Sequence, residues 1–235
     1  MVKYKRVLLK VSGEFLAGDK DSGIDYSVVL RIAESIKRVK QLGCEIGVVV
    51  GGGNFWRGRD NPEMERSRAD HMGMVATVMN ALALADALEK VGVDSRVQTA
   101  LPMLQVAEQY IRGRAIRHLE KGRVVIFACG TGSPYFSTDT AASLRAAEIR
   151  ADIVLKGTMV DGVYNKDPKK FNDAVRFDYI TFTEVLSKDL RVLDGTAASL
   201  CRDTHIPILV FDISDPDNMI RAVEGENIGT IIMEE

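Results

Sequence analysis

The sequence of 235 residues has little cysteine, little histidine and almost no net charge, and each shortage argues against a class of function. Its three cysteines and three histidines are scattered and lack the paired spacing of zinc ligands, so we expect reduced core thiols and no metal site built from these residues. The net charge of −2 gives no overall basic excess, which disfavours a dedicated nucleic-acid binder.

Long apolar runs are also missing. No run approaches the roughly 20 apolar residues of a membrane span, and the apolar part of the N-terminal stretch MVKYKRVLLKVSGE is too short for a signal peptide. We therefore expect a cytoplasmic protein with no membrane partner. Hydrophobic residues make up 46% and charged residues 27%, enough for a sizeable core. Without an internal repeat, low-complexity segment or linker, the chain is expected to form a single domain over residues 1–235.

Short β-branched apolar runs alternate with helical patterns along the chain. The stripe of Val28, Ile32, Ile36 and Val39 indicates a helix capped by Asp25. A second stripe runs from residue 72 through 75 and 79 to 82, and an Ala-rich third helix is expected over 138–150. The expected strands are 7–11, 46–50, 95–99, 124–128, 153–156, 208–211 and 229–232. This alternation predicts an α/β fold, with helices on both faces of a mainly parallel central sheet.

In such a sheet, ligands bind beyond the carboxyl ends of the strands. Four expected loops leave those ends and are rich in glycine, hydroxyl and charged residues. They are KVSGE (10–14), GGGNFWRGR (51–59), CGTGSPYFSTDTA (129–141) and LKGTMVDGVYNKDP (155–168). The last of these opens a long irregular region, 157–181, and loops of that length in compact domains are usually functional.

The glycine loop suggests an anion site of an uncommon kind. Gly51 to Gly53 can bring backbone N–H groups close to a ligand, and Arg57 offers a donor fork suited to phosphate. The sequence has no G-x-x-x-x-G-K-[ST] motif, and Trp56 stands where the third glycine of a dinucleotide-binding motif belongs. An ordinary tight turn with a solvated arginine remains the alternative for this loop taken alone.

Three charged residues at the same sheet edge favour phosphoryl transfer. Lys10 and Lys156 each end an apolar strand, where a lysine is costly to desolvate unless it meets an anion. Asp139 lies at the start of the expected third helix, where a phosphate alone would not need an acid. Together they suit a reaction in which lysines stabilise a moving phosphoryl group and the aspartate organises the lysines or a magnesium ion. Each also has a plainer interpretation, as a lysine reaching solvent or a helix cap.

At this point the motifs identify a family resemblance. KVSGE, VVVGGGNFWRG, ADHMGMVATVMNALAL, GTGSPYFSTDTAA and LKGTMVDGVY, followed by DP at 167–168, resemble in order and spacing the bacterial uridylate (UMP) kinases of the amino-acid-kinase fold family. The resemblance covers essentially the whole chain and implies a three-layer α/β/α sandwich. It also implies the reaction ATP + UMP → ADP + UDP with Mg²⁺ carried by ATP, in de novo pyrimidine synthesis. UMP itself supplies the nucleophilic oxygen, so no catalytic base is expected.

The resemblance assigns roles position by position. As catalytic residues it implies Lys10, Arg57, Asp139 and Lys156. For ATP it implies Lys10, Val11, Ser12, Gly13, Gly53, Arg57, Thr158, Tyr164 and Asp167. For UMP it implies Gly52, Asp70, Thr131, Gly132, Ser133, Pro134, Tyr135, Phe136, Ser137 and Thr138. The part up to about residue 150 would mostly hold UMP, and the part from about 151 to 235 would mostly hold ATP.

Regulation and assembly follow from the same resemblance. It implies a homohexamer built from dimers, with the Met-rich helix around Val75 as an interface, and it implies GTP as activator and UTP as inhibitor. Arg96 and Arg123 match arginines of the GTP site, whereas Ala85 stands where some members carry another arginine, which weakens the expectation of GTP activation.

Two alternative functions stay open. The acceptor could instead be carbamate, glutamate, aspartate or an isoprenyl phosphate, although Asp70 and the GTGSPYFST segment suit a nucleotide. The chain could also be a nucleotide sensor without catalysis, which would not need Lys10, Lys156 and Asp139 together.

Overall fold

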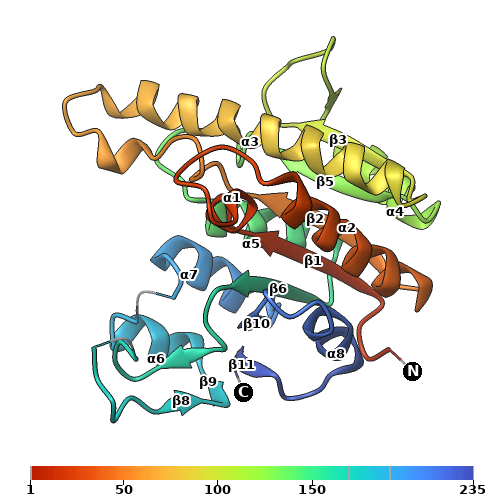
Figure 1. Cartoon of the computed structure of the whole chain (residues 1–235). Helices are drawn as coiled ribbons and strands as arrows, with labels where there is room; N and C mark the ends of the chain where they lie inside the picture. Colours follow the sequence, from red (N-terminus) through yellow and green to blue (C-terminus); the bar gives the residue numbers. More distant parts are fainter. Residues whose placement is uncertain (1, 169, 191, 235) are drawn as a thin grey trace.

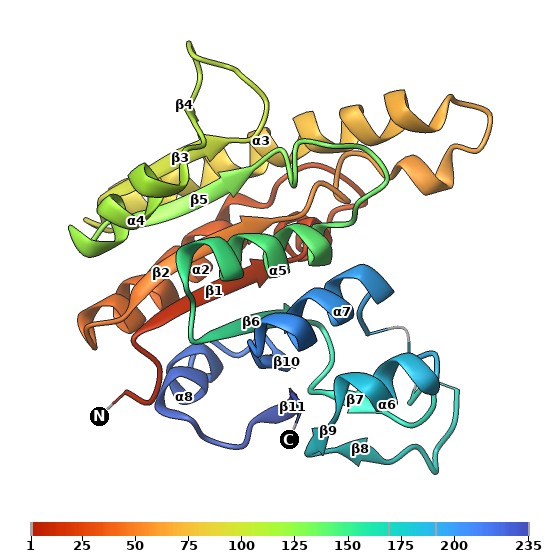
Figure 2. The same cartoon turned by 180° about the vertical axis from the view of Figure 1, so that it is seen from behind.

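The computed structural model describes residues 2–168, 170–190 and 192–234, apart from the side chain of Arg59. Nine strands form the central sheet, in the order β4-β3-β5-β2-β1-β6-β10-β11-β9 (Figures 1 and 2). Its strands are β1 (Arg6–Val11), β2 (Glu45–Val50), β3 (Ser95–Thr99), β4 (Glu108–Gln109), β5 (Val124–Ala128), β6 (Ile153–Thr158), β9 (Tyr179–Ile180), β10 (Ile208–Asp212) and β11 (Gly229–Ile232). All pairs in this sheet are parallel except β10 with β11. The seven expected strands and the mainly parallel sheet are therefore confirmed.

Helices cover both faces of the sheet, as Figures 1 and 2 show from opposite sides. One face carries α1 (Gly13–Ala17), α2 (Tyr26–Gln41), α3 (Arg66–Lys90) and α8 (Asn218–Glu224). The other carries α4 (Arg112–Glu120), α5 (Thr138–Ile149), α6 (Phe182–Ser187) and α7 (Gly195–Thr204). The layers are those of the expected α/β/α sandwich. A short 3₁₀ helix, η1 (Gly58–Asp60), follows the glycine loop.

Strand β1 shows how the sequence divides the core in two. Val7, Leu9 and Val11 pack into the core beneath α2 and α3, whereas Leu8 packs into the opposite core beneath α5. Successive side chains of a strand point to opposite faces, so Lys10 shares the face of Leu8. By the same alternation, Lys156 of β6 shares the face of Val154, which also packs beneath α5. Both lysines therefore point toward the layer that contains α5.

Two of the expected helices begin where the sequence indicates. Asp25 caps α2 and accepts a hydrogen bond from the Ser27 N–H at 2.9 Å, as expected. Helix α5 is capped by Ser137, whose hydroxyl accepts from the Asp139 and Thr140 amides. Asp139 therefore lies inside the first turn, and its carboxylate is free for the lysines.

Helix α3 is the second expected helix. Its apolar stripe of Met72, Val75, Met79 and Leu82 points outward and is 39–45% exposed, whereas Met74 is buried. By length and composition alone, α3 is long and apolar enough to cross a membrane. This differs from the expectation that no run of the sequence approaches the length of a membrane span. Half of its apolar window is buried inside the structure, and the core helix of a soluble protein passes the same test.

The long segment 157–181 is more ordered than expected. It contains β7 (Val163–Tyr164) and β8 (Arg176–Phe177), which pair as an antiparallel two-stranded sheet of their own. It ends at β9, which joins the edge of the main sheet.

Candidate active site

A cavity of about 820 Å³ opens at the carboxyl ends of β1, β2 and β5. Three of the four expected loops line it, together with residues of α3 and the start of α7. From the loops come Lys10, Ser12, Gly13, Glu14, Gly51, Gly52, Gly53, Trp56, Arg57, Gly58, Gly130, Thr131, Ser133, Tyr135, Phe136, Ser137, Thr138, Asp139 and Thr140. The remaining lining residues are Arg66, Asp70, Gly73, Met74, Thr77, Asp194, Gly195 and Thr196.

Two lysines converge on one carboxylate at the inner wall of the cavity. The Lys10 ammonium lies 3.0 Å from Oδ1 of Asp139, and the Lys156 ammonium lies 2.5 Å from Oδ2. Lys156 also donates to the backbone carbonyl of Val192. Lys10 lines the cavity, whereas Lys156 is only 7% exposed and lies behind the carboxylate.

Opposing effects act on the charges of this cluster. Burial by itself would raise the pKa of Asp139, but the positive charges of Lys10 and Lys156 outweigh it and lower that pKa below its usual value. Burial lowers the pKa of Lys156, and the Asp139 carboxylate only partly offsets this effect. Asp139 is thus ionised at neutral pH, and Lys10 offers positive charge to the cavity.

The glycine loop is held by a buried pair of asparagine amides. Asn54 donates to the Asn80 side-chain oxygen at 2.9 Å, and Asn80 donates to the Asn54 oxygen at 2.7 Å and to the Gly51 carbonyl at 2.7 Å. Gly13 packs against this loop so closely that a Cβ there would lie 2.7 Å from the Gly51 carbonyl oxygen. These contacts fix the backbone that faces the cavity. Arg57 leaves the same loop and forms an ion pair with Glu14.

Asp70 joins α3 to the loop that follows β5. Its Oδ2 accepts a hydrogen bond from the Tyr135 N–H and another from Arg66 Nε, each at 2.8 Å. Tyr135 has a positive φ of 72° and is 63% exposed as a residue, beside the cavity. Asp70 can therefore both shape this loop and offer its second oxygen to a ligand.

Asp194 is a cavity residue that sequence reasoning missed. It caps α7 by accepting from the Ala197 N–H at 3.0 Å, and it accepts from the hydroxyls of Ser137 at 2.5 Å and Thr140 at 2.9 Å. Its carboxylate thus ties the start of α5 to the start of α7. An aspartate followed by glycine before a helical pattern is an N-cap signal, but nothing in the sequence relates it to α5.

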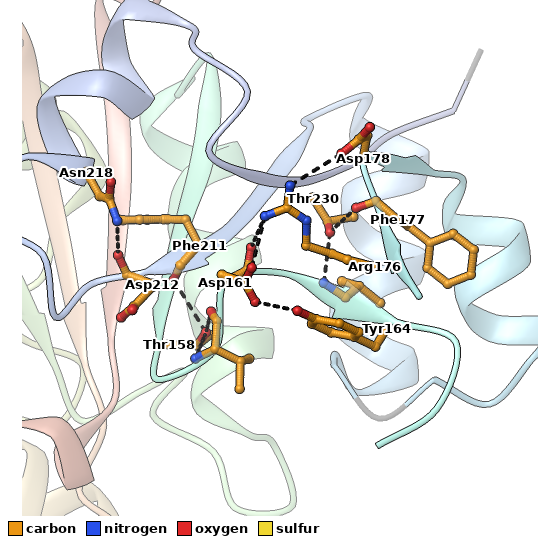
Figure 3. Close-up of polar contacts among 12 residues, drawn as sticks. Thr158, Asp161, Tyr164, Arg176, Phe177, Asp178, Phe211, Asp212, Asn218 and Thr230 are labelled. Carbon is orange, nitrogen blue, oxygen red and sulfur yellow. Dashed lines mark hydrogen bonds and ion pairs between the residues drawn. The ribbon is translucent and has the colours of Figure 1, made fainter. Parts of the chain in front are cut away.

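Several expected site residues do not line this cavity. Val11, Gly132 and Pro134 are absent from its described walls, and so are Thr158, Tyr164 and Asp167 of the segment after β6. Figure 3 shows the hydrogen bonds of that segment, where Tyr164 donates to Asp161 at 2.8 Å. Arg176 holds the other oxygen of Asp161 at 3.1 Å and reaches Asp178 at 3.5 Å.

Arg96 and Arg123 lie apart from the cavity. Arg96 lines a separate hollow of about 380 Å³ together with Ala85 and Glu108. Arg123 contacts His118 at 3.1 Å, and His118 in turn lies 3.1 Å from Glu108. Arg96 Nε lies 3.8 Å from Glu108 Oε1, so both arginines are linked to Glu108, although Arg123 is not among the described residues of the hollow.

The described residues contain no group of three or more His, Cys, Asp or Glu side chains able to hold a metal ion. The Asp139 carboxylate in the cavity wall is already paired with two lysines. This donor set fits a Mg²⁺ ion that arrives on nucleotide phosphates, because Mg²⁺ commonly keeps phosphate and water ligands and needs few from the protein.

Comparison with known proteins decides the family. The model of the amino acid kinase family matches residues 5–212. This chain belongs to the amino acid kinase family. Its sheet order and helix layers are accordingly those of an amino acid kinase, and the expected fold class is confirmed.

Within the amino acid kinase family the chain is similar to solved UMP kinases. The UMP kinase from Bacillus anthracis is 37% identical, with a TM-score of 0.95 over 99% of this chain and 97% of that one. The UMP kinase from Ureaplasma parvum is 38% identical, with a TM-score of 0.93 over 99% of this chain and 100% of that one. The uridylate kinase from Archaeoglobus fulgidus is 30% identical, with a TM-score of 0.75 over 96% of this chain and 99% of that one. The resemblance to bacterial UMP kinases is thus confirmed over the whole chain.

Proposed function

We propose that this chain transfers the γ-phosphoryl group of ATP to UMP, giving UDP and ADP. The observation that carries the proposal is the convergence of Lys10 and Lys156 on Asp139 at the wall of the glycine-lined cavity. Similarity to UMP kinases over nearly the whole of both chains supports the choice of acceptor.

In the proposed reaction a phosphate oxygen of UMP attacks the γ-phosphorus of ATP. The new P–O bond forms as the bond from the γ-phosphorus to the β–γ bridging oxygen breaks, and ADP leaves with that electron pair. Because the attacking oxygen is already ionised at neutral pH, no protein base is needed. Mg²⁺ bound to the ATP phosphates supplies further positive charge to them.

Each residue of the centre then acts by position and charge. Lys10 neutralises charge on the moving phosphoryl group, and Asp139 holds the Lys10 ammonium in place. Lys156 pairs with the other oxygen of Asp139 and keeps that carboxylate ionised. We propose that the backbone of Gly52 contacts the UMP phosphate. Gly53 and Arg57 would contact the ATP phosphates.

We further propose a division of the chain between the two nucleotides. The part of the chain up to about residue 150 binds UMP through Asp70 and the segment Thr131–Thr138. The part from about residue 151 binds adenosine through Thr158, Tyr164 and Asp167. The Asp161–Arg176 network, which contains Tyr164, lies outside the main cavity. This separation supports the assignment of the two segments to two different nucleotides.

For assembly we propose a homohexamer built from dimers that pair through α3. The outward stripe of Met72, Val75, Met79 and Leu82 supports this, because its four apolar side chains lie on one helix face at 39–45% exposure. Light scattering coupled to size-exclusion chromatography measures the assembly, and Val75→Glu is expected to break it.

We also propose that UTP inhibits the enzyme and that GTP activates it at Arg96 and Arg123. Ala85 brings no charge to the hollow beside Arg96, so the response to GTP should be weaker than a third arginine there would give. The enzyme would work in the cytoplasm, where its three free, buried cysteines would stay reduced.

The proposed function is tested by separating UDP from UMP chromatographically after incubation with Mg-ATP. UDP should form only when both substrates are present, and protein with Lys10→Ala prepared in parallel should form almost none, which excludes a contaminating kinase. Absence of UDP from folded wild-type protein that binds ATP would overturn the proposal.

A further inference from the structure

Arg145 is a buried cation that the proposed reaction does not use. It lies on α5, six positions after Asp139, and is only 4% exposed. Its guanidinium has three partners. Nη1 donates to Glu148 Oε2 at 2.6 Å, Nη2 donates to the Gly130 carbonyl at 3.2 Å, and the group lies 3.9 Å from the ring centroid of Tyr110. Burying such a charge is costly, so its partners indicate what it does.

Glu148 and Tyr110 hold the guanidinium of Arg145 rigidly. The Tyr110 hydroxyl donates to the same Glu148 oxygen at 2.6 Å, and burial raises the pKa of Tyr110, so this phenol stays protonated as a donor. Tyr110 also packs edge-on against Phe127 of β5, with ring centroids 5.7 Å apart. Arg145 is therefore fixed by an ion pair on one side and by an aromatic face on another.

The remaining partner, the Gly130 carbonyl, belongs to the wall of the cavity. Gly130 opens the segment 130–138 that lines the cavity, and it follows Cys129 in a run of two left-handed residues, with φ of 63° at Cys129 and 57° at Gly130. The Cys129 N–H is tied to the Thr77 hydroxyl at 2.8 Å. The Gly130 carbonyl is the next anchor along the chain, and it is held by Arg145 alone among the contacts the structure describes.

The hydrogen bond from Arg145 to the Gly130 carbonyl orients the peptide plane between Gly130 and Thr131, at the start of the loop. In a trans peptide the N–H of the next residue points away from the carbonyl. With the Gly130 carbonyl turned to Arg145, the Thr131 N–H points in the opposite direction within that plane. A left-handed glycine can readily adopt other conformations, so the hydrogen bond selects one of several accessible loop arrangements.

We propose that Arg145 is a positioning residue that sets the segment 130–138 for the phosphoryl acceptor, by fixing the Gly130–Thr131 peptide. The proposal rests on the assignment of this segment to UMP under the proposed function. Arg145 touches neither nucleotide in this account. Loss of Arg145 should weaken the binding of UMP and leave the binding of ATP unchanged. The glycine loop and the segment after β6, which we assign to ATP, make no described contact with Arg145.

The test compares Arg145→Lys with wild-type protein and with Arg114→Lys, an exposed arginine on α4. A lysine cannot contact Glu148, Gly130 and the Tyr110 face at once. We expect the KM for UMP to rise about ten-fold, the cost of one charge-assisted hydrogen bond, with the KM for ATP unchanged. Tyr110→Phe keeps the ring and the Gly130 bond, so it should have a smaller effect.

Hydrogen exchange of the nucleotide-free protein gives a second readout that needs no substrate. In Arg145→Lys the amides of 130–137 should exchange faster, whereas those of 51–54 should not change. Equal rises of both KM values, or unchanged exchange in 130–137, would overturn the proposal and leave Arg145 a purely structural ion pair. If wild-type protein makes no UDP, the proposed function fails, and the exchange data alone decide whether Arg145 positions this loop.

Discussion

Lys10 and Lys156 are register partners on the neighbouring parallel strands β1 and β6, and they reach the two oxygens of the same Asp139 carboxylate. The sheet thus brings two positive charges to one point of its carboxyl edge, and α5 delivers the acid that keeps them there. Asp139 can do this because Ser137, not Asp139, caps the helix. This small cluster is the structural basis of the proposed phosphoryl transfer.

Replacing Lys10 with alanine should lower the rate of UDP formation by about 10²–10³-fold, because the charge on the transferring phosphoryl group loses its stabilising partner. UMP affinity should change little, since Lys10 lies on the ATP side of the proposed contact. Calorimetric titration with UMP and steady-state kinetics measure the two quantities. Lys90→Ala, on the exposed end of α3, is the control. Near-normal turnover in Lys10→Ala would remove the proposed role of Lys10.

Asp139→Asn should reduce the free energy of unfolding by about 3–5 kcal/mol at pH 7, because it leaves the buried Lys156 without its counter-charge. The pKa of Asp139 is lowered in the folded state, so its ionised form stabilises the protein fully above the unfolded pKa of about 3.9, and this contribution is lost as the pH falls through the lower folded pKa. The difference between wild type and variant should therefore shrink below about pH 4. Urea denaturation over a pH series measures it. A difference that does not depend on pH would show that Asp139 is not ionised in the fold.

Asp70→Asn should weaken UMP binding about 10–100-fold and leave ATP binding nearly unchanged, because Asp70 shapes the loop at Tyr135 and lies in the cavity wall. Calorimetric titration with UMP and with a non-hydrolysable ATP analogue separates the two. Asp86→Asn, an exposed acid farther along α3, serves as the control. The reverse pattern, with ATP weakened and UMP retained, would mean that the two nucleotide sites have been exchanged in our assignment.

Gly13→Ala should destabilise the protein by about 1–3 kcal/mol and greatly reduce turnover, because the new Cβ would lie 2.8 Å from the Gly53 backbone nitrogen and 2.6 Å from the Asn54 side-chain oxygen. Gly113→Ala makes the matched control: it lies within α4 with open space around it, so alanine there should stabilise the helix by about 0.5–1 kcal/mol. Thermal unfolding and UDP formation are measured for both. Equal behaviour of the two variants would contradict the close packing of Gly13 on the glycine loop.

The sequence predicted the sheet well because its strands are covered on both faces and are therefore apolar throughout, as in Val124–Ala128. It predicted the meeting of Lys10, Lys156 and Asp139 because the carboxyl ends of parallel strands share one edge. It predicted a helix from the stripe of Met72 to Leu82, and α3 confirms that helix; helical periodicity marks an apolar face without saying whether that face is covered by the same chain.

Tertiary contacts account for what the sequence did not predict. From the sequence, Asp194 is predicted only as the N-cap of its own helix. Its hydrogen bonds with the hydroxyls of Ser137 and Thr140 form only when α7 packs beside α5. The short strands β7 and β8 have only two residues each, too few for a periodic pattern, and they pair across a long turn. Arg145 lies in an Ala-rich helix where its burial cannot be read from local spacing.

The most direct test of the account is ADP release from Mg-ATP by wild-type protein, measured with UMP, dUMP, CMP, AMP, glutamate, aspartate and carbamate as separate acceptors. The account predicts rapid release with UMP and, at most, slow release with the amino acids, carbamate and AMP. Rapid release with glutamate, aspartate or carbamate and none with UMP would keep the fold and the lysine–aspartate cluster but contradict the assignment of Asp70 and the segment 131–138 to UMP.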